Sequence, residues 1–392
     1  MAYRTPTLLI AIGALSLAPA FSQCAAQSYP TGPAQRSSNP GYTTGVVRAD
    51  TVVSGLQSPW AFEFLPDGRM IVTEKGGQLR IVTREGRKSE PLTGVPAVVS
   101  GGQGGLLDVA LDPQFATNRL VYLSFSEPGE GGLSGTSVAR GRLTETGLEN
   151  VQVIYAQRPK VQSGGHFGSR LVFDRNGFLF VTQGDRQSGR FRAQVQDLST
   201  GFGKLMRINA DGTVPRDNPF VGRENAQPEI WAYGLRNVQG ATLHPETGQL
   251  WTIEHGPQGG DELNRPEPGK NYGWPVIGYG VNYGGASMHD SGEGAGMEQP
   301  VYYWVPIIAP GGMTFYTGNV YPGWRGNLFI GGLQSMALIR LAFDANGRIA
   351  TEERYLEEVR GRIRDVKQGP DGNLYVLVEN RGLIMRVVPV AR

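Results

Sequence analysis

The chain has 392 residues, with 37 Lys and Arg against 35 Asp and Glu, so its formal net charge is +2. This near-neutral balance excludes a broad nucleic-acid footprint and a polybasic membrane patch. A hydrophobic content of 39% and 57 glycines, about twice the usual glycine share of roughly 7%, indicate an all-β protein with many tight turns rather than a helical bundle.

Residues 1–26 have the pattern of an export signal that is cleaved from the mature protein. Arg4 supplies the charged start, Leu8 to Leu17 the apolar stretch, and Ala25-Ala26 the small residues before the cleavage point. The apolar stretch is too short to span a bilayer comfortably, so we expect a periplasmic or secreted protein without stable membrane insertion. A lipid-anchored Cys24 is the alternative. Cleavage after Ala26 leaves no cysteine, which excludes disulfides and thiolate chemistry.

One local pattern recurs along the rest of the chain: a hydrophobic pair, a turn of Pro or Asp with Asp or Asn and Gly, and an apolar strand. Three copies are clear, at residues 64–72, 172–181 and 368–376, and three are looser. The six turns are Pro66-Asp67-Gly68, Asp112-Pro113, Asp174-Arg175-Asn176-Gly177, His244-Pro245, Trp324-Arg325-Gly326 and Pro370-Asp371-Gly372. Glycine after Asp or Asn adopts a positive φ at little cost, and the flanking residues suit a pleated sheet. The spacing corresponds to propeller blades of about 40–50 residues with insertions.

We therefore predict a six-bladed β-propeller forming one catalytic domain at residues 42–392, after a flexible linker at residues 27–41. A pair of β-sandwiches would require a mid-chain break in composition, and the sequence has none. The terminal strands at residues 46–53 and 384–390 can close the ring within one blade. The longest stretch without a strand pattern, residues 256–299, is predicted to be a functional loop over the central channel.

His166 and Asp185 are candidates for catalysis. His166 precedes a predicted strand at residues 171–173, and Asp185 follows one at residues 178–182. Ends of neighbouring strands in one blade can face the same side, so Asp185 can orient His166 as a general base. An ordinary turn histidine is the alternative. The sequence contains no dinucleotide-binding, P-loop, zinc-protease or nucleophilic-serine motif.

Arginines and acidic residues suggest two kinds of ligand. Arg236 beside Asn237 offers a rigid fork for a planar acidic or carbonyl group. Arg362 and Arg364 alternate along a strand and so point to one face, where an anion between them would relieve their repulsion; a solvated edge strand is the alternative. Residues 254–262 concentrate carboxylates and turned backbone carbonyls, which suit calcium better than zinc, although a solvated acidic turn would look the same.

Several of these stretches together resemble the soluble quinoprotein sugar dehydrogenases, the glucose/sorbosone dehydrogenase family, and especially its bacterial aldose dehydrogenases. The matching stretches are Gly101-Gly102-Gln103-Gly104-Gly105-Leu106-Leu107, Gly165-His166-Phe167-Gly168-Ser169-Arg170-Leu171, Gly184-Asp185, Gly234-Leu235-Arg236-Asn237, His255-Gly256-Pro257 with Asp261-Glu262, Asn271-Tyr272-Gly273-Trp274-Pro275 and Arg362-Ile363-Arg364-Asp365. They occur in family order over nearly the whole mature chain.

The resemblance implies a propeller that holds pyrroloquinoline quinone (PQQ) over its channel with a calcium ion on the cofactor. His166 would remove the proton from the anomeric hydroxyl of an aldose, and Asp185 would hold its tautomer. The implied cofactor-binding residues are Gln103, Arg236, Asn237, His255, Arg362 and Arg364, with Arg236 also counted among the catalytic residues. Gly256 and Pro257 would bind the cofactor calcium through their carbonyls, and Glu262 and Tyr272 would belong to a second, structural calcium.

Two residues depart from the best-known glucose-oxidising members. Gln334 stands where they have a cofactor-binding Lys, and His255 stands where they have Gln. Fewer charged contacts should weaken PQQ binding. The departures also argue against a narrow preference for glucose, so we expect broad aldose oxidation with a soluble or membrane electron acceptor. A calcium-dependent propeller hydrolase of the lactonase kind, and a non-catalytic propeller that binds glycans or proteins, are the alternatives.

Overall fold

The computed structural model describes Met1, residues 33–289 and residues 291–390. The predicted export signal beyond Met1, with Cys24, and the first part of the predicted linker therefore lie outside the described residues. Within the described ranges, no helix is long and apolar enough to cross a membrane.

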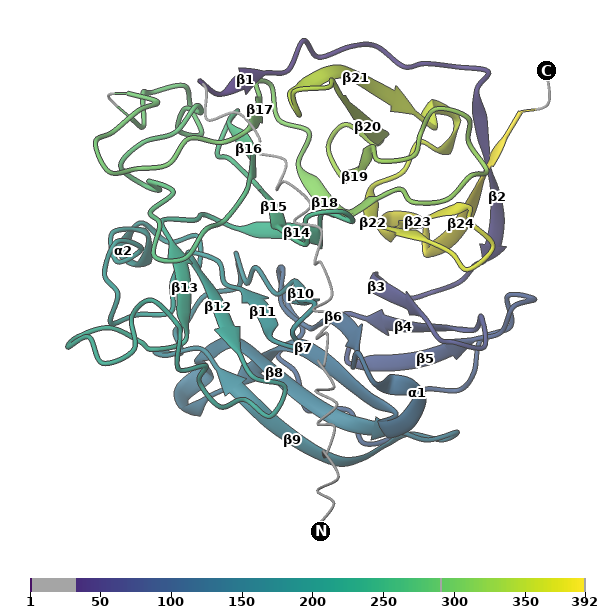
Figure 1. Cartoon of the computed structure of the whole chain (residues 1–392), viewed down its shortest axis with the longest axis horizontal. Helices are drawn as coiled ribbons and strands as arrows, with labels where there is room; N and C mark the ends of the chain where they lie inside the picture. Colours follow the sequence, from purple (N-terminus) through teal and green to yellow (C-terminus); the bar gives the residue numbers. More distant parts are fainter. Residues whose placement is uncertain (2–32, 290, 391–392) are drawn as a thin grey trace.

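Six sheets are arranged around one central axis (Figure 1), which confirms the predicted six-bladed β-propeller. We number the blades in chain order by their sheets: β3 to β5, β6 to β9, β10 to β13, β14 to β17 with β1, β18 to β21, and β22 to β24 with β2. The first strand of each blade is innermost, so β3, β6, β10, β14, β18 and β22 surround the axis.

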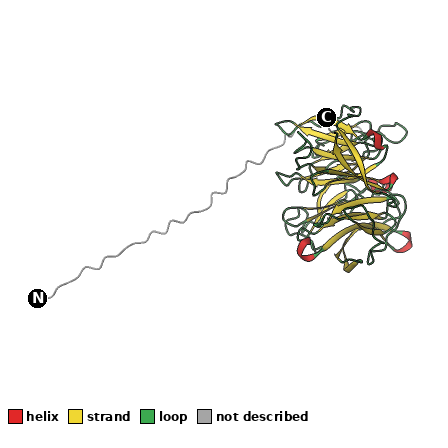
Figure 2. Ribbon diagram, turned by 90° about the vertical axis from the view of Figure 1, so that its right-hand side faces the viewer, coloured by secondary structure: helices red, strands yellow, loops and turns green. Residues whose placement is uncertain are grey.

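The bounds of the elements are as follows. Blades 1 to 3 contain Pro59–Phe64 (β3), Met70–Glu74 (β4), Gln78–Val82 (β5), Leu106–Leu111 (β6), Leu120–Pro128 (β7), Ser134–Leu143 (β8), Leu148–Ala156 (β9), Leu171–Phe173 (β10), Leu179–Thr182 (β11), Lys204–Ile208 (β12) and Ile230–Tyr233 (β13). Blades 4 to 6 contain Val238–Leu243 (β14), Leu250–Glu254 (β15), Asp261–Asn264 (β16), Tyr302–Trp304 (β17), Gln35–Arg36 (β1), Pro310–Phe315 (β18), Leu328–Gly332 (β19), Leu338–Phe343 (β20), Ile349–Tyr355 (β21), Ile363–Gln368 (β22), Leu374–Val378 (β23), Leu383–Pro389 (β24) and Val47–Val53 (β2). The short helices α1 (Phe115–Asn118) and α2 (Gly189–Arg192), and 3-10 turns at Glu130–Gly132, Glu357–Val359 and Glu379–Arg381, lie outside the sheets (Figure 2).

Each of the six recurrent turns joins the first and second strands of a blade. Gly68, Gly177 and Gly372 have φ values of 82°, 83° and 79°, in the left-handed region that glycine adopts without strain. The side chain of Asp174 accepts hydrogen bonds from the backbone N–H groups of Asn176 and Phe178, both at 2.9 Å. The turn residues therefore fix the face of the ring on which the first strand of each blade ends, opposite the face on which the second strand ends.

The hydrophobic core lies between neighbouring blades. One cluster around Trp60 and Leu106 joins blades 1 and 2, and equivalent clusters fill the other five junctions, including the one between blades 6 and 1 around Phe62 and Leu377. Full burial of a large apolar side chain contributes about 1.5–3 kcal/mol. Because every blade is covered on both faces, the ring is stabilised around its whole circumference.

The two ends of the propeller close the ring. β2 pairs antiparallel with β24, which confirms the predicted closure within one blade. By contrast, residues 33–41 do not form the flexible linker that the sequence predicted. Gln35 and Arg36 pair in parallel with β17, and the Gln35 amide exchanges hydrogen bonds with the backbone of Ile349. This segment thus binds blades 4 and 5 together.

The stretch at residues 256–299 is also more ordered than predicted, because it contains β16, which pairs with β15 and β17. The prediction of a continuous loop was wrong here because Asp261 looks like a turn residue. Its buried carboxylate accepts hydrogen bonds from the backbone N–H groups of Gly256, Ile308 and Ala309, each at 2.8 Å. These three hydrogen bonds compensate for the burial of the Asp261 carboxylate, so a polar residue is tolerated in this strand.

Arg170 lies at the centre of the ring. Its Nη1 atom is 2.8 Å from Asp108 and 3.3 Å from Asp365, and its Nε donates to the carbonyl of Gln239. These four residues belong to blades 2, 3, 4 and 6. The Asp108–Arg170–Asp365 group separates a cavity of 190 Å³ on the side of Trp60, Gln239 and Arg364 from one of 290 Å³ on the side of Glu63 and Lys367.

Candidate cofactor and catalytic site

His166 and Asp185 meet on the face of the ring where the second strands of the blades end. Nδ1 of His166 is 2.6 Å from Oδ1 of Asp185, and Oδ1 also accepts a hydrogen bond from the backbone N–H of Gln187 at 2.7 Å. His166 is only 3% exposed and Asp185 is fully buried. His166 is therefore no ordinary turn histidine. Its partner favours the tautomer with a proton on Nδ1, which leaves Nε2 unprotonated as a base.

Tight backbone packing holds the dyad. His166 has a φ of 45°, a left-handed conformation that is uncommon outside glycine and frequent at functional sites. A Cβ at Gly184 would lie 2.1 Å from the carbonyl oxygen of His166, so only glycine allows the two segments to approach this closely. The side-chain oxygen of Gln103 accepts a hydrogen bond from the backbone N–H of His166 at 2.8 Å. Gln103 is itself exposed.

The electrostatic environment suits a general base. Burial lowers the pKa of His166, and the charges of Arg236 and Arg192 lower it further, against the opposing effect of Asp185. Burial would raise the pKa of Asp185, but the hydrogen bond from His166 and the nearby charges hold it below its ordinary value. At neutral pH, Asp185 is thus ionised and His166 is neutral.

Arg236 and Asn237 follow β13 and lie beside the dyad. The backbone carbonyl of Arg236 accepts a hydrogen bond from the N–H of Asp185 at 2.8 Å, and Nη1 of Arg236 donates to the carbonyls of His255 and Gly256, both at 2.8 Å. Nε of Arg236 is buried and has no hydrogen-bond partner within the described residues. The side-chain oxygen of Asn237 accepts from the backbone N–H of Gly168 at 3.1 Å, which ties blade 4 to the segment of His166.

Arg362 and Arg364 line the 190 Å³ cavity, together with Gln103 and His255. Glu379 lies between the two arginines: its Oε2 is 2.9 Å from Nη2 of Arg364 and 3.7 Å from Nε of Arg362. Both arginines therefore face one cavity, on the same face of the ring as the dyad, and neither belongs to a solvated edge strand. The charge of Glu379 relieves part of their repulsion.

Lys75 is a cation of this cavity that the sequence analysis missed. Nζ of Lys75 donates to the carbonyl of Gly102 at 2.8 Å, and burial followed by the charges of Arg364 and Arg362 lowers its pKa. Gln334, by contrast, is exposed, and its neighbour Leu333 lines the cavity instead. The sequence did carry a signal for Lys75. The second strand of every blade ends on this face, so a cationic residue directly after β4 is expected to lie near the cavity.

His255 lies at the boundary between this cavity and a smaller one. Its Nε2 is 2.7 Å from the carbonyl oxygen of Pro310, so the ring donates there. Burial lowers the pKa of His255 to about 3, and the charges of Arg364 and Arg236 act in the same direction. His255 is therefore a neutral hydrogen-bonding group in a cationic neighbourhood.

The four residues predicted to bind calcium, Gly256, Pro257, Glu262 and Tyr272, all line the smaller cavity. Burial and the adjacent carboxylate of Glu254 raise the pKa of Glu262, and burial raises that of Glu254 to about 7. Neither carboxylate has an ion-pair partner within the described residues. Over the same residues, no group of three or more His, Cys, Asp or Glu side chains forms a metal site, so any ion here must also use backbone oxygens.

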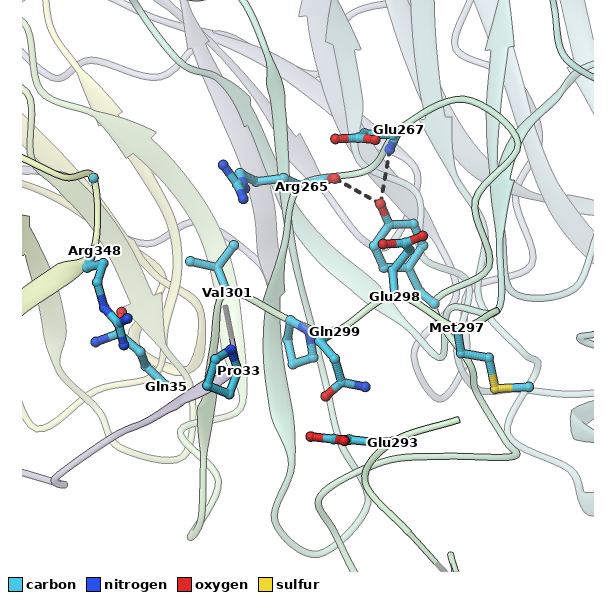
Figure 3. A pocket seen from close by; sticks show the side chains of 13 residues that line it. Pro33, Gln35, Arg265, Glu267, Glu293, Met297, Glu298, Gln299, Val301 and Arg348 are labelled. Atoms are coloured by element: carbon cyan, nitrogen blue, oxygen red, sulfur yellow. Dashed lines mark hydrogen bonds between the residues drawn. The ribbon is translucent and has the colours of Figure 1, made fainter. Parts of the chain in front are cut away.

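A larger cavity of 510 Å³ (Figure 3) shares none of its described lining residues with the 190 Å³ cavity. Pro33 and Gln35 from the N-terminal segment, Glu267 and Arg348 contribute to its lining. Tyr272 lines both this cavity and the smaller one, and its hydroxyl accepts from the N–H of Glu267 and donates to the carbonyl of Arg265. Since the larger cavity contains none of the predicted catalytic residues, its size does not make it the active site.

Comparisons with known proteins identify the family to which the sequence and the fold are similar. A family model described as Glucose / Sorbosone dehydrogenase matches residues 56–386. An aldose sugar dehydrogenase of Escherichia coli (strain K12) is 45% identical over 350 residues, covering 88% of this chain and 93% of that protein. The apo-form crystal structure of the soluble aldose sugar dehydrogenase from Escherichia coli superposes with a TM-score of 0.84 at 43% identity, covering 88% of this chain and 99% of the other. The PQQ-bound aldose sugar dehydrogenase from Streptomyces coelicolor gives a TM-score of 0.72 at 27% identity, covering 92% and 100%.

Proposed function

The chain belongs to the glucose/sorbosone dehydrogenase family, and from this premise we propose that it is a periplasmic quinoprotein that oxidises the C1 hydroxyl of aldose sugars to lactones. It is an aldose sugar dehydrogenase, and thus an oxidoreductase. The proposal assigns residues 42–392 to a single catalytic domain. The observation that carries it is the hydrogen-bonded pair of His166 and Asp185 beside a cavity lined by Arg362 and Arg364.

The residues around the 190 Å³ cavity fit PQQ, which carries three carboxylates. Lys75, Arg362 and Arg364 offer three positive charges, and Glu379 is the only carboxylate that the described part of the chain contributes to the lining. Cationic forks of this kind bind carboxylates by charge-assisted hydrogen bonds. Gln103, Asn237, His255 and the unpartnered Nε of Arg236 would supply the remaining polar contacts.

The smaller cavity fits calcium. A divalent cation would neutralise the adjacent carboxylates of Glu254 and Glu262, neither of which forms an ion pair within the described residues. The carbonyls of Gly256 and Pro257 are hard oxygen ligands of the kind that calcium prefers, and they would hold the cofactor calcium. Glu262 and Tyr272 would hold a second, structural calcium.

The protein groups would divide the reaction as follows. When bound, PQQ supplies a two-electron acceptor and calcium supplies Lewis acidity. Nε2 of His166 takes the proton from the C1 hydroxyl, which makes the hydride on C1 a better leaving group as C1–O1 becomes a carbonyl. Asp185 keeps the Nδ1–H tautomer and stabilises the imidazolium that forms. Burial of both residues excludes water from the proton transfer.

A direct test adds PQQ and calcium to the purified apoprotein, with a panel of aldoses and a dye as electron acceptor. We expect dye reduction with several aldoses that requires both PQQ and calcium. The matched control is His166→Asn, which tolerates the left-handed backbone but has no imidazole base. Absence of dye reduction across the panel would refute the proposal. Comparing a soluble with a membrane-bound acceptor addresses the physiological partner.

A further inference from the structure

The second oxygen of Asp185 has its own hydrogen-bond donor. While Oδ1 receives His166 and the backbone N–H of Gln187, Oδ2 accepts from the indole Nε1–H of Trp274 at 2.9 Å. Nε of Arg192 is 4.0 Å from the same Oδ2. Trp274 comes from the long segment between β16 and β17, 89 positions away from Asp185 along the chain.

Trp274 is itself firmly held. It is 5% exposed and packs against Val161, Val195 and Phe202. Its backbone N–H donates to the carbonyl of Gly234 at 2.8 Å, and its carbonyl accepts from the side chain of Gln196 at 2.7 Å. The guanidinium groups of Arg192 and Arg236 each lie 5.2 Å from its ring. The indole N–H is therefore directed at Asp185 before any substrate arrives.

We propose that Trp274 is a positioning residue, whose indole N–H holds Oδ2 of Asp185 so that Oδ1 stays directed at Nδ1 of His166. The inference rests on the proposed function, in which His166 is the base. It adds a connection that the dyad alone does not provide, because Trp274 is two residues from Tyr272 in the proposed calcium segment. The order of that segment is thereby linked to the geometry of the base.

The loss of this N–H has a defined electrostatic consequence. The backbone N–H of Gln187 still anchors Oδ1, so the carboxylate stays beside His166. With only the more distant Arg192 left beside Oδ2, the negative charge of Asp185 stabilises the imidazolium form more strongly. The other charged groups facing His166, which are Arg192 from α2 and Arg236 at the start of blade 4, oppose protonation and are unchanged. The carboxylate of Glu254 accepts a hydrogen bond from the backbone N–H of Arg236 and interacts with the charge of Arg236. His166 should therefore hold its proton to higher pH.

The experiment compares Trp274→Phe with Trp304→Phe. Trp304 is fully buried between blades 4 and 5, and its indole N–H has no hydrogen-bond partner within the described residues, so this control removes the same atoms without touching the dyad. In apoprotein labelled with ¹⁵N-histidine, the pKa of His166 should rise in Trp274→Phe and stay unchanged in Trp304→Phe. In the loaded enzyme, the acid limb of kcat/KM should move to higher pH by the same amount as the pKa of His166, and a shift of one unit reduces kcat/KM below the limb by about tenfold.

An unchanged or lowered pKa of His166 in folded Trp274→Phe would overturn the inference. If that variant does not fold, the wild-type apoprotein still decides: the indole Nε1–H resonance of Trp274 should shift with the same midpoint as the titration of His166, and an invariant resonance contradicts the proposal. These resonance measurements do not depend on sugar oxidation. An inactive wild type with the expected titration would therefore refute the proposed function and leave the role of Trp274 intact.

Discussion

Glu379 forms an ion pair with Arg364 in which Nη2 and Oε2 are 2.9 Å apart, on the wall of the candidate cofactor cavity. Nη1 of the same guanidinium donates a hydrogen bond to the side-chain oxygen of Gln239 at 2.9 Å. The amide nitrogen of Gln239 in turn donates to the carbonyl of Gly168 at 3.0 Å. The position of Arg364 is thus fixed relative to the segment that carries His166. A cofactor held by Arg364 would be aligned with the base by protein contacts that exist without it.

Arg364→Gln should weaken PQQ binding to the apoprotein. Loss of one charge-assisted interaction of about 1.5–3 kcal/mol corresponds to a dissociation constant higher by about 10- to 100-fold. An absorbance titration with PQQ measures this effect. Arg360→Gln removes the same charge from an exposed position on the preceding turn, and it should change the dissociation constant little. Equal weakening in both variants would mean that general charge, rather than this cavity, binds the cofactor.

His166→Asn should lower kcat by about 10²- to 10⁴-fold, the usual contribution of a general base. PQQ binding should remain close to that of the wild type, because His166 lies beside the cationic cavity and does not supply its charge. Steady-state kinetics with a dye acceptor and a parallel PQQ titration separate the two properties. A variant that loses PQQ affinity instead of kcat would assign His166 to the cofactor.

The pH dependence of kcat/KM should follow the lowered pKa of His166. The base must be neutral, so the acid limb of kcat/KM should lie at lower pH than that of a histidine with the ordinary pKa of 6.5, and kcat/KM should fall as the pH drops through the lowered value. Asp185→Asn removes the charge that raises this pKa, so the acid limb should move to still lower pH. At the same time kcat should fall, because an asparagine NH₂ group in the place of Oδ1 would donate to Nδ1 of His166 and favour the wrong tautomer. An acid limb that moves to higher pH would contradict this assignment.

Calcium should stabilise the apoprotein through Glu262. At a calcium concentration about 100 times its Kd, binding adds about 2.7 kcal/mol to the free energy of unfolding. Glu262→Gln should lose this gain while being no less stable than the wild type without calcium, since it removes a repelling carboxylate. Thermal melts with and without calcium test both statements, with the exposed Glu224→Gln as the control. A full calcium response in Glu262→Gln would place the ion elsewhere.

Arg170→Met should destabilise the apoprotein by about 3–5 kcal/mol, because it leaves the buried carboxylates of Asp108 and Asp365 without their cation. Adding Asp108→Asn and Asp365→Asn should restore part of the loss. Urea unfolding measures these differences. Arg87→Met, which breaks an exposed contact with Glu85, should change stability by less than about 1 kcal/mol.

Local chemistry made much of the fold predictable. The six turns and the terminal strands each depend on residues close together in the chain, so the sequence indicates both the number of blades and the closure of the ring. The N-terminal segment was mispredicted because Gln35 and Arg36 form too short a strand to show any periodicity. Asp261 was mispredicted because its hydrogen-bond acceptors are used by backbone groups that lie up to 48 positions away.

The same distinction applies to the site. The pairing of His166 with Asp185 follows from strand ends within one blade, and the structure brings the two together. Lys75 had a local signal, its position directly after β4, but the residues that complete its cavity come from other blades. The role of Trp274 could not be recognised locally, since its partner Asp185 lies 89 positions away. The prediction for Gln334 came from its position in the family motif alone. Such a comparison does not reveal that Lys75, from a different blade, supplies a positive charge to the cavity. The roles assigned to all these residues in binding and catalysis stay predictions.

The pairing of β2 with β24 also has a consequence during biosynthesis. The ribosome synthesises β2 more than 300 residues before its partner β24, so β2 has no strand to pair with until the end of translation. Unpaired strand edges recruit other chains, and long-range pairings form slowly. A polypeptide truncated before Leu383 would keep this edge permanently open, and aggregation rather than loss of chemistry would be its first defect.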